Sequence, residues 1–62
     1  MTSEQMLHRA KQAETIDQRL AEVEREHEQI GFYEEALEAR RLRLEQQAAA
    51  LYWRDRAGGA AP

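Results

Sequence analysis

The sequence contains no cysteine, and this absence excludes disulfide bonds and thiolate metal sites. No apolar run approaches the roughly 20 residues that cross a bilayer, and residues 1–11 are too polar for a secretory signal. A chain of 62 residues without such staples buries little surface alone and usually needs a partner or a second copy. We therefore expect a cytoplasmic protein with no membrane role that gains stability by association.

Residues that end helices are also scarce. Between Met1 and Ala57 there is no proline and one glycine, Gly31, and valine and isoleucine together number three. The dominant residues are Ala, Glu, Arg, Leu and Gln, which favour helix, whereas strands need β-branched residues. The composition predicts an all-α fold.

The ends of the helical region carry recognisable signals. The hydroxyl of Thr2 or Ser3 can cap the first free amides of a helix, and Gly58 and Gly59 can end one. These signals predict a single helical module over residues 1–57, followed by a flexible C-terminal tail at 58–62.

A seven-residue repeat of aliphatic side chains runs through this module. Six residues in one heptad position (d) form the repeat: Ile16, Val23, Ile30, Leu37, Leu44 and Leu51. Such a row is typical of a coiled-coil seam, to which Leu20 adds an a position. In a parallel dimer, however, the a positions would place Glu34 against Glu34 and Arg41 against Arg41. Because stacked like charges are costly to desolvate, we expect antiparallel pairing.

Antiparallel pairing joins residues whose numbers add up to about 64. Leu20 then faces Leu44, and His27 faces Leu37. The same register brings Glu24 near the arginines at 40–43.

Two arrangements share this register. In the first, helices at about 3–29 and 33–57 form a hairpin with a turn at 30–33, where Gly31 can adopt a positive φ. In the second, one continuous helix forms an antiparallel coiled-coil dimer, and the absence of Ser, Thr, Asn, Asp and Pro between positions 18 and 54, which leaves a second helix without an N-terminal cap, favours it. We favour the hairpin, with the continuous helix as the alternative.

A second apolar stripe lies opposite the seam in the second half of the chain, with Phe32, Leu42 and Trp53 as its large members. A lone two-helix hairpin buries too little to be stable, so a second interface is needed. We expect this partner face to serve dimerisation into a four-helix bundle or binding to another protein. The function expected is a small self-associating protein–protein interaction module, such as an adaptor, regulator or assembly component.

The alternative function is nucleic-acid binding through Arg40, Arg41 and Arg43. A four-helix bundle made of two hairpins resembles the Rop family of plasmid RNA-binding proteins. The resemblance covers architecture and chain length, and it implies a hairpin-dimer regulator; no binding motif of that family maps onto this sequence. The net charge of −3 does not favour general attraction to nucleic acid.

Catalysis and cofactor binding have little support. Glu24 and His27 have the i, i+3 spacing of di-iron carboxylate bundles, but the further inward carboxylates that such a site needs are lacking. There is no glycine-rich phosphate loop, and two helices enclose no pocket. We expect a protein that is not an enzyme and holds no metal or cofactor.

Overall fold

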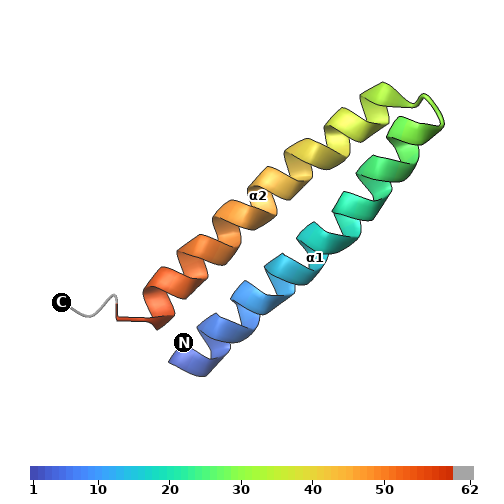
Figure 1. The fold of residues 1–62 in the computed structure, drawn as a ribbon. Helices are drawn as coiled ribbons and strands as arrows, with labels where there is room; N and C mark the ends of the chain where they lie inside the picture. Colours follow the sequence, from blue (N-terminus) through green and yellow to red (C-terminus); the bar gives the residue numbers. More distant parts are fainter. Residues whose placement is uncertain (60–62) are drawn as a thin grey trace.

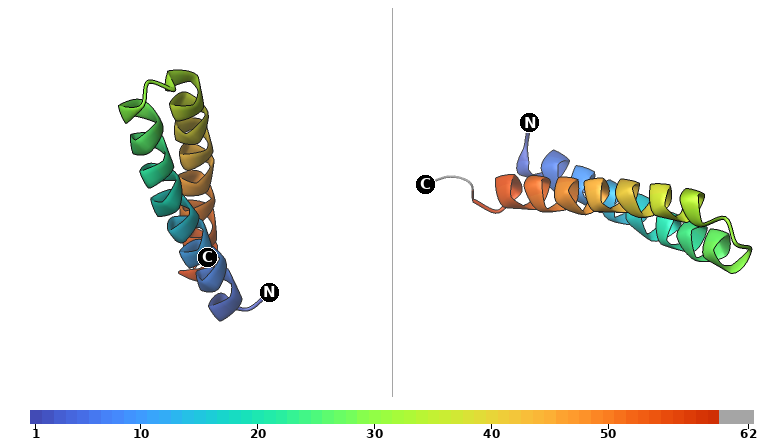
Figure 2. Two further views of the ribbon diagram at one scale, coloured as in Figure 1. Left: turned by 90° about the vertical axis from the view of Figure 1, so that its right-hand side faces the viewer. Right: turned by 90° about the horizontal axis from the view of Figure 1, so that it is seen from above.

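The computed structural model describes residues 1–59, which form two helices, α1 (Ser3–Gln29) and α2 (Tyr33–Ala57). The helices lie side by side and antiparallel, with the turn at one end and the start of α1 and the end of α2 at the other (Figure 1). Their Cα atoms span 47 × 16 × 12 Å, and the helices stay adjacent along their length in both views of Figure 2. The predicted all-α hairpin is confirmed, and the chain is not one continuous helix.

The start of α1 is capped as its sequence suggests. Gln5 donates its backbone N–H to the hydroxyl of Thr2 at 3.1 Å, and its side-chain oxygen accepts the Thr2 N–H at 2.9 Å. This reciprocal pair satisfies two donors that would otherwise lack a partner. At the far end of the chain Gly58 and Gly59 follow α2 in a turn. The rest of the predicted tail, residues 60–62, lies outside the described residues.

The turn between the helices is closed by backbone groups. Gly31 has φ +84°, a conformation that residues with a Cβ rarely adopt. Its N–H bonds the carbonyl of Glu28 at 3.2 Å, and the N–H of Phe32 bonds the carbonyl of His27 at 2.8 Å. These two bonds form a Schellman motif, which ends α1 at the one glycine in the middle of the chain.

α2 begins without a side-chain cap. Phe32 occupies the capping position, and its carbonyl accepts the N–H of Ala36 at 3.0 Å. Glu34 and Glu35 lie in the first turn, where their charges favour the positive end of the helix dipole.

Small side chains separate the two helices. The buried apolar residues are all alanines: Ala10 and Ala13 of α1, and Ala36, Ala39 and Ala50 of α2. Alanines permit close approach of two helices, since no long side chain holds the backbones apart. Most of the large aliphatic side chains therefore lie on the outer faces of the hairpin.

The predicted antiparallel register is correct, but the predicted contact face is wrong. Glu24 pairs with Arg40 and Asp17 with Gln47, as the register requires. Leu44, expected opposite Leu20, is instead 59% exposed, and Leu37, expected opposite His27, is 61% exposed. α2 is rotated about its axis so that its alanine stripe, rather than its leucines, faces α1. The heptad pattern predicts that the aliphatic d residues face the opposite helix, whereas the alanines allow closer helices with charged residues between them.

Candidate functional site

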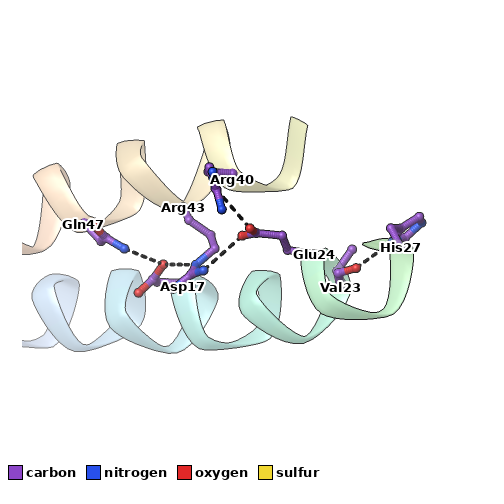
Figure 3. Close-up of polar contacts among 7 residues, drawn as sticks. All are labelled: Asp17, Val23, Glu24, His27, Arg40, Arg43 and Gln47. Carbon is purple, nitrogen blue, oxygen red and sulfur yellow. Dashed lines mark hydrogen bonds and ion pairs between the residues drawn. The ribbon is translucent and has the colours of Figure 1, made fainter. Parts of the chain in front are cut away.

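A cluster of charged side chains lies in the contact between the helices (Figure 3). Glu24 is 6% exposed, and its two carboxylate oxygens accept from Arg40 Nε at 3.2 Å and Arg43 Nη1 at 3.0 Å. Arg43 also donates from Nε to Asp17 at 3.0 Å, and Gln47 donates to the same Asp17 oxygen at 3.2 Å. Each carboxylate has partners on the opposite helix, so the cluster fixes how α1 and α2 are aligned.

The cluster is held in its charged form. The hydrogen bond from Arg43, together with the charge and hydrogen bond of Arg40, lowers the pKa of Glu24, although burial opposes this shift. Hydrogen bonds to Asp17 and Glu24 raise the pKa of Arg43. A buried carboxylate that lost its arginine partners would be strongly unfavourable, so the cluster penalises any other alignment of the two helices.

One long side of the hairpin carries further polar links. Arg54 forms an ion pair with Glu14, and the Glu24–Arg40 pair lies along the same edge. Arg40, Gln47 and Arg54 are seven residues apart and therefore share one row of α2. We call this edge the ionic side.

The opposite long side is apolar. The guanidinium of Arg9 lies 5.2 Å from the centre of the Trp53 ring, which links one row of α1 to one row of α2. Ile16 and Val23 follow Arg9 at intervals of seven residues and therefore share its row of α1. Ala49 lies four residues before Trp53, and Leu42 lies seven before Ala49, so both lie beside Trp53 on the same side of α2. We call this the apolar side, and it comprises Ile16, Leu20 and Val23 of α1 and Leu42, Ala49 and Trp53 of α2.

A third apolar feature belongs to α2 alone. Leu37, Leu44 and Leu51 are between 59% and 69% exposed and lie one row further from α1 than Arg40. We call these three residues the leucine row. It is the most exposed aliphatic surface of the two helices, and one helix supplies all of it.

The structure thus groups the residues of the predicted seam and of the predicted partner face differently from the sequence pattern. The seam residues of α1 (Ile16, Leu20 and Val23) lie on the apolar side together with Leu42 and Trp53 from the predicted partner face. The seam residues of α2 form the separate leucine row. Ile30 is 63% exposed beside the turn. Phe32 is also at the turn, where its ring centre lies 6.1 Å from that of His27.

Sequence reasoning missed the alanine stripe and the part played by Asp17. A signal for the stripe was present, since Ala36, Ala39 and Ala50 recur at helical spacing on one face of α2. Asp17 is the only aspartate in α1, and the heptad pattern of the sequence does not mark it as a partner of Arg43 and Gln47.

The three arginines considered for nucleic acid all have carboxylate partners. Arg40 and Arg43 bond Glu24, and Arg41 forms an ion pair with Glu38. Neighbouring carboxylates reduce the positive potential that a phosphate backbone would meet. Nucleic-acid binding stays a prediction to which the geometry adds no support.

Within residues 1–59, no three His, Asp or Glu side chains are grouped in a way that could hold a metal ion. Over the same residues, neither helix combines the length and apolar character needed to span a membrane. The chain matches no known family model, and searches of curated proteins and of solved structures found no similar protein.

Proposed function

We propose that this protein is a small self-associating helical module that works through protein–protein contact, as an adaptor, regulator or assembly component. The proposal includes a homodimer and a cytoplasmic location, the latter testable by fractionation of cells that express a tagged chain. The observation that carries it is the amount of surface that the hairpin leaves exposed.

The accessible surface of the hairpin is 4957 Å². A compact monomer of 7.2 kDa exposes about 4100 Å² by the usual scaling of surface with mass. The excess of about 800 Å² reflects the elongated 47 × 16 × 12 Å shape of the hairpin, and it is about the area that each partner buries in a protein–protein interface of standard size. The exposed surface also includes Ile16, Val23 and Leu42, which are between 38% and 44% exposed, and the leucine row. An interface is the ordinary explanation of large apolar patches.

The buried contact inside the hairpin is correspondingly weak. Its buried apolar residues are five alanines, with larger residues such as Leu20 and Trp53 only half-buried, and an alanine side chain contributes less burial energy than a leucine or valine. Two helices of 27 and 25 residues with so small a core need further burial to remain paired. Association of a second hairpin supplies it.

The test is the mass in solution, measured by size-exclusion chromatography with light scattering over a wide range of concentrations. We expect twice the chain mass of 7.2 kDa, together with far-UV circular dichroism of a largely helical protein. Small-angle scattering on the same samples should give a largest dimension close to the 47 Å length of the hairpin. A helical species that stays monomeric at all concentrations would refute self-association.

A further inference from the structure

We infer that the apolar side is the surface on which a second copy of this chain docks, giving a four-helix bundle with both ionic sides outward. This inference rests on the proposed self-association and names its surface.

The first reason is area. A helix of 25 residues is about 37 Å long, and two helices packed about 8–10 Å apart present a strip close to 20 Å wide. A face of that size, with the apolar side at its centre and polar residues such as Arg9 at its end, covers about 700 Å², close to the roughly 800 Å² that each partner buries in a standard interface. The leucine row, supplied by one helix about 10 Å wide, offers about half of that area. Only a face to which both helices contribute reaches the area of a standard interface.

The second reason is the distribution of side chains across that face. Leu20 and Trp53 are half-buried, and Ile16, Val23 and Leu42 flank them as partly exposed aliphatic residues. Together they line both helices in the middle of the hairpin, at residues 16–23 of α1 and 42–53 of α2. A matching face laid on top would complete the burial of these side chains as in the core of a helix bundle.

The third reason is electrostatic. The interhelical pairs Glu24–Arg40 and Glu14–Arg54 lie along the opposite edge, so docking on the apolar side leaves the solvent exposure of both pairs as it is in the single hairpin and requires no further desolvation of either pair. Arg9 is the one cation shown against an aromatic ring of this face, and its guanidinium can remain at the rim. A second copy fits because its own apolar side is equally free of ion pairs, and a two-fold dimer uses the same patch on both chains.

The decisive comparison uses two leucines of the same helix. Leu42→Glu places a charge on the apolar side, and Leu44→Glu places the same charge on the leucine row, two residues away. We expect Leu42→Glu to raise the dissociation constant of the dimer by at least about 100-fold, since a two-fold interface carries the change twice. Leu44→Glu should change the dissociation constant by less than about threefold, the usual size of the effect of a substitution on an exposed surface. Sedimentation velocity over a dilution series measures both constants.

A second measurement needs no variant and covers the case in which Leu42→Glu fails to fold. Trp53 is the only tryptophan, so its fluorescence reports on the apolar side. We expect its emission to shift to longer wavelength as dilution takes the wild-type chain from dimer to monomer, over the concentrations at which far-UV circular dichroism keeps its helical signal. Emission that stays constant across a dissociation seen by sedimentation places the interface elsewhere and overturns the inference.

The outcomes separate this inference from the proposed function. If the wild type is a dimer that only Leu44→Glu dissociates, the leucine row is the interface; self-association then stands and the apolar side does not. If both variants dissociate the dimer equally, the inference also fails, because the contact is not confined to one face. If the wild type is monomeric throughout, self-association fails too, and a different protein becomes the candidate occupant of the apolar side.

Discussion

The contact between the two helices and the outer faces of the hairpin differ in the size of their apolar side chains, and the larger ones are outside. Between the helices lie alanines and an ionised cluster around Glu24, whereas the outer faces carry leucine, isoleucine, valine and tryptophan. In most packed helices the large aliphatic side chains lie inside, because they contribute most of the burial energy. The inner contact therefore sets the spacing and alignment of α1 and α2, and the outer faces hold the apolar area that remains available for association.

The largest expected effect comes from enlarging a residue of the inner contact. Ala39 is 4% exposed between the helices, and Ala39→Leu would push them apart. We expect the free energy of unfolding to fall by about 1–3 kcal/mol, the usual cost of overpacking. Thermal unfolding followed by circular dichroism at fixed concentration measures it.

Ala48→Leu is the matched control, because Ala48 is exposed on the same helix and the helix propensities involved are the same. It should leave the unfolding temperature nearly unchanged. Equal effects of the two substitutions would mean that close approach at the alanine stripe does not hold the helices together.

A smaller effect with a distinct pH dependence is expected from the cluster. Because Arg43 and Arg40 lower the pKa of Glu24, the folded state binds this proton less readily than the unfolded chain. The stabilisation by Glu24 is thus fully present above the unfolded pKa of about 4.3, and it is lost as the pH falls through the lower, folded pKa. Glu24→Gln should therefore be less stable than wild type at pH 7, with a difference that narrows in acid.

The control for this experiment is Glu22→Gln, which removes an exposed carboxylate of the same helix. Its unfolding temperature should follow that of the wild type from pH 7 to pH 3. The role assigned to Glu24 is wrong if Glu24→Gln and wild type differ by the same amount at every pH.

The smallest effect is expected at the outer ion pair of the ionic side. The Arg54 and Glu14 side chains are 53% and 42% exposed, so Glu14→Gln should cost about 0.2–1 kcal/mol. Because salt screens exposed charges, this difference should disappear at about 1 M salt. A cost that persists at high salt would show that Glu14 contributes through packing.

The sequence was sufficient for the fold class and the antiparallel register, and it favoured a turn at Gly31 over one continuous helix. Composition argues against strands, the charges in the a positions disfavour parallel pairing, and Gly31 is the one residue suited to a positive φ in the middle of the chain. These inferences hold because they depend on backbone preferences and on the order of residues along the chain, and both can be read from the sequence.

The rotation of each helix about its axis was not predictable in the same way. α2 has two stripes that could face α1, one with Leu37 and Leu44 and one with Ala36 and Ala39. Choosing between them requires weighing aliphatic burial against close backbone approach and against the bonds of Glu24 to the arginines. Those quantities depend on three-dimensional distances. For this reason the sequence pattern assigned Ile16 and Val23 to one surface and Leu42 to another, although all three lie on the apolar side.

The turn closed by backbone bonds has a consequence for the order in which the hairpin assembles. Ion pairs join residues 16, 26 and 40 positions apart, at increasing distance from Gly31. Closing the widest of these loops directly costs only about 0.8 kcal/mol more than closing the narrowest, but once the inner pair has formed each later pair closes a much shorter segment. Contacts should then form outward from the turn like a zipper, with the Arg9–Trp53 contact among the last. A temperature-jump experiment in which Trp53 fluorescence recovers before the helical signal would contradict that order.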